Sequence, residues 1–239
     1  MAAPANPNER LIVALDVPSA EAALRLISKL GGLVSFYKVG LELYTAEGPE
    51  FVRALTSQGL KVFLDLKFLD IDETVRRATR QVARLGVSFL TVHESGKAVA
   101  AAVEGAKGSD LRILAVTVLT SMSAEDVKET GWLGSVEDLV LNRAQKALAD
   151  GCHGVIASGQ EAAKIHALWG HQLAIVTPGI RPSGSPPDDQ KRTATPAEAI
   201  AAGADYLVVG RPIRDAKDPY AAAQQIVHEI QEGLGVPKV

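Results

Sequence analysis

The sequence is poor in cysteine and in aromatic residues. Cys152 is the only cysteine among 239 residues, and Phe, Trp and Tyr together make up 5% of the chain. A single cysteine excludes an internal disulfide and a cysteine-rich metal site, and it fits a reducing compartment such as the cytoplasm. We expect Cys152 to be a small buried thiol at the start of a strand, because free cysteines are commonly buried and inert.

Strong net charge and long apolar runs are also absent. The formal net charge of -3 does not indicate binding to nucleic acid or to a membrane surface, so an anionic ligand would need local basic groups. No run of eighteen apolar residues predicts a membrane span. The opening MAAPANPNE has neither the charged nor the apolar region of a signal peptide. We therefore expect residues 1–9 to form a disordered leader.

The chain does contain a repeated alternation of short apolar runs with segments of helical period. The predicted strands are 11–15, 35–39, 61–66, 88–92, 112–119, 154–157, 173–176 and 206–209. The predicted helices are 20–30, 47–57, 73–85, 97–106, 136–149, 161–169, 196–202 and 219–233. Ser19 and Thr195 stand where helix N-caps are expected. Such alternation is typical of parallel strands joined by crossover helices.

Eight β/α units within one chain predict a (β/α)8 TIM barrel, ahead of an open doubly wound sheet. No break in composition marks a second domain, so we expect one catalytic barrel domain over residues 10–239. The reactive end of such a barrel lies where the strands run into their following loops. Polar residues gather at those positions. They are Asp16, Lys38, Asp65, Lys67, Asp70, His93, Thr120, Ser121, Ser158, Arg181 and Arg211.

The segment FLDLKFLDI, residues 63–71, places three charges in an otherwise apolar stretch. Charges taken out of water are costly unless they are paired, so three together suggest a network. Because strand side chains alternate, Asp65 and Lys67 should point together into the barrel mouth, with Asp70 just beyond in the loop. A structural salt bridge that closes the strand is the alternative, and Lys38 and Asp16 at the preceding strand ends make it less favoured.

Two glycine-arginine segments near the end of the chain predict a phosphate site. TPGIRP (177–182) follows the seventh strand, and VVGRPI (208–213) includes the eighth. Loops after these strands commonly bind phosphate, with glycine admitting the backbone and arginine neutralising charge. A surface ion pair is the alternative for Arg211. The long segment 178–191 is expected to form a lid.

Other motifs are weak or missing. His93 stands alone at a strand end, where histidine is more often structural than catalytic, and the remaining histidines lack metal-ligand spacing. The GxGxxG and P-loop motifs are both absent. Catalysis would therefore depend on carboxylates, lysines and binding energy.

The motifs of this sequence resemble those of the orotidine 5'-phosphate decarboxylase family. The pattern Asp-x-Lys-x-x-Asp-Ile, with Thr three residues beyond the Ile, stands here over residues 65–74. Further matching segments are 14–16, 37–40, 116–121, 177–181, Gln190 and 209–213, in family order over about residues 10–232. Leu69, Asp72 and Glu73 depart from the pattern, because many members have His at the first position and Pro-Asn or a similar pair at the others.

The resemblance implies decarboxylation of orotidine 5'-monophosphate to UMP, with no metal and no organic cofactor. It implies that Lys67 protonates C6 of the pyrimidine, that Asp65 lies beside the substrate carboxylate, and that Asp70 enters the partner subunit's site in a homodimer. Lys38 would support the aspartates as part of the catalytic group. The implied substrate-binding residues are Asp16, Lys38, Ile71, Thr74, Thr120, Arg181, Gln190, Gly210 and Arg211.

Two other functions remain open on the sequence. One is a magnesium-dependent 3-keto-hexulose-phosphate decarboxylase or synthase on the same barrel, whose sites also carry an Asp-x-Lys-x-x-Asp run. Those families lack the combination of Ile71 and Thr74, and EDTA would inhibit them. The other is a non-catalytic barrel that senses a nucleotide or sugar phosphate, which would keep Gly210 and Arg211 without needing Lys67 between two aspartates.

Overall fold

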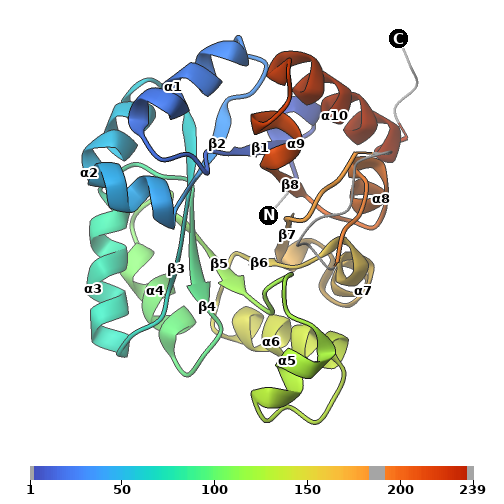
Figure 1. Ribbon diagram of the computed structural model, residues 1–239. Helices are drawn as coiled ribbons and strands as arrows, with labels where there is room; N and C mark the ends of the chain where they lie inside the picture. Colours follow the sequence, from blue (N-terminus) through green and yellow to red (C-terminus); the bar gives the residue numbers. More distant parts are fainter. Residues whose placement is uncertain (1–2, 183–191, 236–239) are drawn as a thin grey trace.

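The computed structural model describes residues 3–182 and 192–235. Eight parallel strands follow one another around a closed barrel, and β1 pairs with β8 to complete it (Figure 1). The strands are β1 Leu11–Ala14, β2 Phe36–Gly40, β3 Lys61–Phe68, β4 Phe89–His93, β5 Arg112–Val116, β6 Gly154–Ile156, β7 Ala174–Thr177 and β8 Tyr206–Val209. The predicted (β/α)8 barrel is confirmed.

Helices form a ring around the strands, as Figure 1 shows. They are α1 Ala20–Lys29, α2 Leu41–Ser57, α3 Asp72–Ala83, α4 Ala98–Ala106, α5 Ala124–Glu129, α6 Val136–Ala149, α7 Gly159–Trp169, α8 Pro196–Ala201, α9 Arg211–Arg214 and α10 Pro219–Gly233, with short 3-10 helices η1 Pro7–Arg10 and η2 Gly170–Gln172. The predicted N-caps are confirmed, because Ser19 accepts the N–H of Ala22 and Thr195 accepts that of Glu198.

Some element boundaries differ from the prediction for identifiable reasons. The helices α5 and α9 were not predicted: α5 buries only Val127 and so shows no apolar face, and the four residues of α9 are too few to show a helical period. The helix α2 begins at Leu41 rather than at residue 47, with a break at Gly48, whose φ is +67°. Strand β5 ends at Val116 rather than at residue 119, because the next residues leave the sheet.

Two apolar layers stabilise the barrel. The larger one lies between the strands and the surrounding helices, and the smaller one fills the barrel interior. Four of the few aromatic rings, Phe36, Phe63, Phe89 and Tyr206, pack inside with centroids 5.1 to 6.0 Å apart. Such pairs contribute about 0.5–1.5 kcal/mol each beyond the area they bury. The barrel is therefore filled with side chains below its reactive end.

The start of the chain is more ordered than the sequence suggests. Helix η1 is capped by the Asn6 side chain, and Arg10 donates from Nε to the carbonyl of Pro4 over 2.8 Å. The ordered chain thus begins before residue 10, inside the segment that was expected to be a disordered leader. Cys152 is buried as predicted, and burial raises the pKa of its thiol to about 11. Within the described ranges, no helix is long and apolar enough to cross a membrane.

Candidate active site

Strand β3 is irregular where its charged residues stand. Its pairing with β4 shifts register between Leu64 and Phe68, which is a bulge. Lys67 lies in this bulge with φ +51°, the only positive φ of a non-glycine residue among those described. Its backbone N–H donates to the Thr91 hydroxyl on β4 over 3.0 Å. The bulge was not predicted, because it depends on the partner strand.

The charged side chains at the top of the barrel form one connected chain. The Nζ of Lys67 donates to Asp65 Oδ1 over 2.9 Å, and the Nζ of Lys38 lies 3.7 Å from the other Asp65 oxygen. Lys38 also donates to Asp16 Oδ1 over 2.7 Å. The order Lys67, Asp65, Lys38, Asp16 alternates in sign, so every charge has an opposite neighbour. These contacts join Lys67, Asp65, Lys38 and Asp16 within the single chain, and Asp70, the third charge of the segment that predicted a network, is not among them.

Asp65 is the more buried of the two carboxylates in this network, with 15% of its side chain exposed against 44% for Asp16. Burial raises the pKa of Asp65, but the charges of Lys38 and Lys67 and hydrogen bonds from Lys67 and Thr91 outweigh it. The pKa of this carboxyl therefore lies below its usual value. The group is an anion at neutral pH, which keeps both ammonium groups in place.

A cavity of about 230 Å³ opens beside this network. Asp65, Lys67 and Lys38 line it together with residues of the loop after β5. Its remaining lining residues are mostly apolar. We call it the central cavity; its lining is Lys38, Phe63, Asp65, Lys67, Val116, Val118, Leu119, Thr120, Ser121, Ile156, Pro178 and Val208. The predicted contribution of Thr120 to the site is consistent with its place here.

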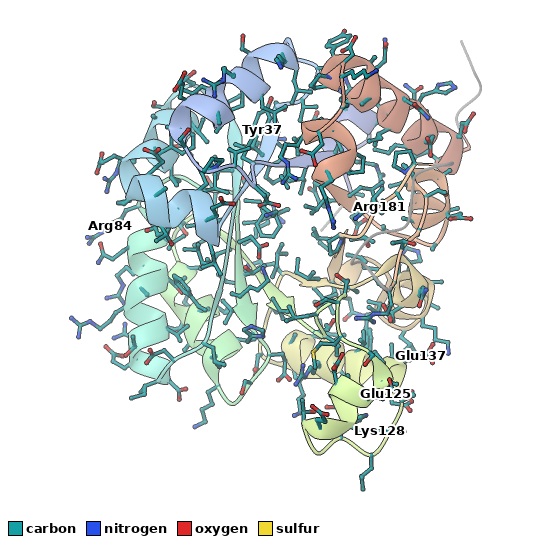
Figure 2. All side chains as sticks on the ribbon, in the orientation of Figure 1. Tyr37, Arg84, Glu125, Lys128, Glu137 and Arg181 are labelled. Atoms are coloured by element: carbon teal, nitrogen blue, oxygen red, sulfur yellow. The ribbon has the colours of Figure 1, made fainter. Side chains whose placement is uncertain are left out.

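A second cavity of about 140 Å³ adjoins the first, since both are lined by Lys38, Pro178 and Val208. We call it the arginine cavity; it is lined by Ala14, Asp16, Lys38, Pro178, Gly179, Arg181, Val208, Gly210, Arg211 and Arg214. Arg181 follows β7 and is labelled in Figure 2, and it lines this cavity together with Arg211 and Arg214 of α9. The residues expected to bind phosphate, Arg181, Gly210 and Arg211, are thus together, and three arginines give the cavity positive charge.

Three predicted site residues lie apart from both cavities in the single chain. Asp70, Ile71 and Thr74 are exposed around the start of α3. The Asp70 carboxylate accepts the backbone N–H of Ile71 over 2.6 Å. The departures Leu69, Asp72 and Glu73 lie in the same region. Gln190 and most of the predicted lid, residues 183–191, fall outside the described residues.

Three residues of the site were missed by sequence reasoning. Thr91 donates to Asp65 Oδ1 over 2.8 Å. Its position within a predicted strand is the only sequence feature that pointed to a place near the site. A Cβ on Gly40 would lie 3.1 Å from both Asp16 Oδ1 and Lys38 Nζ, so this glycine leaves room for their contact. Arg214 donates to the Asp16 carbonyl over 2.9 Å and is held by Asp215.

Two polar strand ends do not belong to the cavities. Ser158 caps α7, and its hydroxyl is bonded to the buried Glu161 carboxylate. His93 is half-buried and lines neither cavity. Burial lowers the pKa of His93, and the charges of Lys67 and Arg143 lower it further while Asp65 opposes them. Among the residues described, no group of three or more His, Cys, Asp and Glu side chains is arranged to hold a metal ion.

The chain is similar over nearly its whole length to curated bacterial proteins. It is 55% identical over 226 residues to orotidine 5'-phosphate decarboxylase of Nitrobacter winogradskyi, covering 95% of this chain and 94% of that protein. It is 53% identical over 227 residues to the enzyme of the same name from Afipia carboxidovorans, covering 95% and 97%.

Solved structures share the fold. The crystal structure of orotidine 5'-phosphate decarboxylase from Lactobacillus acidophilus matches with a TM-score of 0.82 and 39% identity, covering 92% of this chain and 98% of that one. An uncharacterized conserved protein from Geobacillus kaustophilus matches with a TM-score of 0.79 and 37% identity, covering 92% and 99%. The profile of one family matches residues 9–226. The chain therefore belongs to the orotidine 5'-phosphate decarboxylase / HUMPS family.

Proposed function

We propose that this chain decarboxylates orotidine 5'-monophosphate to UMP in pyrimidine biosynthesis, without a metal or an organic cofactor. The observation that carries the proposal is the Lys67 ammonium, held 2.9 Å from Asp65 at the edge of a mostly apolar cavity. Relatives that are 53% and 55% identical carry the name of this enzyme. The arginine cavity beside it has the charge that a substrate phosphate requires. We propose the cytoplasm as its place of action.

The cavities suggest how the substrate lies. Its phosphate occupies the arginine cavity between Arg181 and Arg211, and its pyrimidine occupies the central cavity beside Thr120. The ribose then lies at the shared boundary, where Lys38 and Asp16 meet. Phosphate binding far from the reacting carbon supplies binding energy that orients the base.

The chemistry needs a fixed positive charge. Loss of carbon dioxide from an sp2 ring carbon leaves an electron pair in the ring plane, where the π system cannot accept it. The Lys67 ammonium stabilises this carbanion electrostatically and then donates a proton to C6. Because Asp65 and Thr91 hold Lys67 before substrate arrives, little reorganisation is required in the transition state.

Asp65 has a second proposed effect. It is ionised, so a substrate carboxylate placed beside it would be repelled, and the repulsion would end when carbon dioxide departs. Two unit charges at 4 Å interact by about 4 kcal/mol at an effective dielectric constant of 20. The pair of Lys38 and Lys67 keeps Asp65 ionised throughout.

We also propose that the working enzyme is a homodimer in which Asp70 enters the partner subunit's site. The support is the exposure of Leu69 and Ile71, which flank Asp70 with 59% and 76% of their surface accessible in the single chain. Large apolar side chains exposed together commonly mark an interface. A second chain would cover them and bring Asp70 toward Lys67.

The test is the ultraviolet absorbance of orotidine 5'-monophosphate incubated with EDTA-treated protein. The proposal predicts loss of the orotate chromophore, release of carbon dioxide and formation of UMP. A flat trace from folded protein, with turnover of a 3-keto-hexulose phosphate only after magnesium is restored, would identify the rival enzyme instead. Nucleotide binding without turnover of either substrate would indicate a sensor.

A further inference from the structure

The loop after β5 forms one wall of the central cavity. We call residues 117–121 the exit loop, and four of its residues, Val118, Leu119, Thr120 and Ser121, line that cavity. Strand pairing ends at Val116, so the carbonyls of the exit loop have no partner in the sheet. The Leu119 carbonyl accepts the N–H of Met122 over 2.9 Å in the following turn. Buried backbone carbonyls need hydrogen-bond donors, and the other donors to this loop come from elsewhere in the fold.

Two arginine side chains supply such donors to the exit loop. Arg143 on α6 donates from Nη1 to the carbonyl of Thr117. Arg192, which precedes the N-cap of α8, donates from Nη2 to the carbonyls of Val118 over 3.3 Å and Leu119 over 3.1 Å. Three successive carbonyls thus accept hydrogen bonds from side chains of two other segments, helix α6 and the residues before α8. Their planar guanidinium groups fix direction as well as distance.

Each of these arginines is bound in turn by a buried carboxylate. Arg192 donates from Nη1 to Oε1 of Glu161, whose other oxygen accepts the N–H of Ser158 over 3.1 Å. Arg143 lies with its Nε 3.9 Å from Glu94. The side chains of Glu161 and Glu94 are only 5% and 6% exposed. Glu161 therefore holds Arg192 by a hydrogen bond, Glu94 pairs with Arg143 at longer range, and both arginines hold the exit loop.

This arrangement is costly as a source of stability alone. The Arg192–Glu161 pair, whose side chains are 10% and 5% exposed, loses hydration on burial, and replacing both partners of such a pair by apolar residues is often neutral or stabilising. The Nε of Arg192 is also buried without a hydrogen-bond partner among the described residues, which adds to the cost. A positioning role explains why the chain keeps these ion pairs, because both arginines donate to backbone carbonyls of the exit loop, which lines the central cavity.

We propose that Arg143 and Arg192 are positioning residues that fix the exit loop and thereby set the width of the central cavity for the pyrimidine. Neither guanidinium lines that cavity or the arginine cavity. Loss of either one lets the wall of Val118 to Ser121 move relative to Lys67. This inference rests on the proposed function, since it assigns the base to the central cavity and the phosphate to the arginine cavity.

The experiment compares the full chain with Arg192→Met, Arg192→Lys and Arg143→Met. The measurements are kcat and KM for orotidine 5'-monophosphate, and dissociation constants for UMP and for inorganic phosphate. Both Met variants are expected to weaken UMP binding at least tenfold while the phosphate constant changes less than twofold. Arg192→Lys keeps the charge without the planar fork, so it is expected to recover only part of the loss.

Arg10→Met is the matched control. Arg10 also donates to a backbone carbonyl, that of Pro4, but it stands directly before β1 at the opposite end of the barrel. It is expected to lower stability without changing UMP affinity. If Arg192→Met does not fold, the double variant Arg192→Met/Glu161→Leu removes both charges of the pair and is measured in the same way.

Three results would overturn the inference. The first is unchanged KM, kcat and UMP affinity in the Met variants. The second is an equal loss of UMP and phosphate affinity, which indicates general damage. The third is an equal effect of Arg10→Met. A wild-type chain that binds UMP but does not turn over orotidine 5'-monophosphate would instead contradict the proposed function, and the UMP affinities would still test the positioning role.

Discussion

Lys67 combines a strained backbone with a fixed side chain. A non-glycine residue at φ +51° costs on the order of 1 kcal/mol or more, and such strain persists only where neighbours maintain it. Here Thr91 accepts the Lys67 N–H, and Asp65 accepts its ammonium. The cost is consistent with a residue whose position matters more than its contribution to stability.

Gly40 provides a direct test of how closely the network is packed. Its φ of -95° is open to alanine, so Gly40→Ala adds no backbone strain. The new methyl group would press on Asp16 and Lys38 at 3.1 Å and separate them. We expect kcat/KM to fall at least tenfold, with a loss of about 1 kcal/mol in the free energy of unfolding. Steady-state kinetics measures kcat/KM, and urea denaturation measures the free energy of unfolding. An unchanged kcat/KM in Gly40→Ala would contradict the close packing of Asp16 and Lys38.

His153 predicts a pH dependence of stability. Burial, together with the charge of Arg112, lowers the pKa of His153, and its Nδ1 accepts the N–H of Ile113 over 3.1 Å. The native imidazole therefore stays neutral while the unfolded one takes up a proton near pH 6.5. Because the unfolded state binds more protons, stability falls as the pH drops below 6.5.

Replacing His153 by asparagine keeps an acceptor and removes the titration. Urea denaturation between pH 7 and pH 5 is expected to show a smaller decline in stability for His153→Asn than for the wild type. Equal slopes for wild type and His153→Asn would refute this role.

At the scale of elements, the sequence carries most of the strands and the longer helices but not their irregularities. The alternation of apolar runs predicts all eight strands, because each is buried on both faces. The bulge at Lys67 depends on pairing with β4, and the Thr117 carbonyl directly after β5 is bound by Arg143, 26 residues further along the chain. Local pattern contains no signal for such contacts.

The packing of α3 against α4 depends on Gly105. A Cβ at this position would lie 2.4 Å from the backbone carbonyl of Arg76, closer than any real contact. Alanine is the better helix former by about 1 kcal/mol, yet the clash should outweigh that gain. We expect Gly105→Ala to lower the free energy of unfolding by about 2 kcal/mol in urea denaturation. A more stable Gly105→Ala variant would contradict this expectation, because it would mean that α3 and α4 can move apart to admit the methyl group at little cost.

At the scale of the whole molecule, the barrel brings residues distant in sequence to one end. The sequence places Asp16, Lys38, Asp65, Lys67, Arg181 and Arg211 at strand ends, and the structure gathers them around two adjoining cavities. Thr91 and Arg214 have no motif of their own and become visible only through their partners. The role of Asp70 still depends on a second chain and stays a prediction.

Mixed dimers test that prediction. Asp70→Asn and Lys67→Met should each abolish most activity as homodimers. In a dimer with one chain of each kind, one site regains both wild-type groups and the other lacks both. An equal mixture that exchanges subunits is therefore expected to recover about a quarter of the wild-type sites. If subunit exchange is demonstrated and no activity returns, Asp70 does not act in the partner subunit's site.

The most direct test of the account is the turnover of Lys67→Met with EDTA-treated protein and orotidine 5'-monophosphate. Methionine keeps the length of the side chain and removes the ammonium that we propose as electrostatic stabiliser and proton donor. The account predicts a fall in kcat of about 10⁴-fold, with UMP still bound within about tenfold of wild-type affinity. Turnover within tenfold of wild type in a folded variant would show that the chemistry does not depend on Lys67.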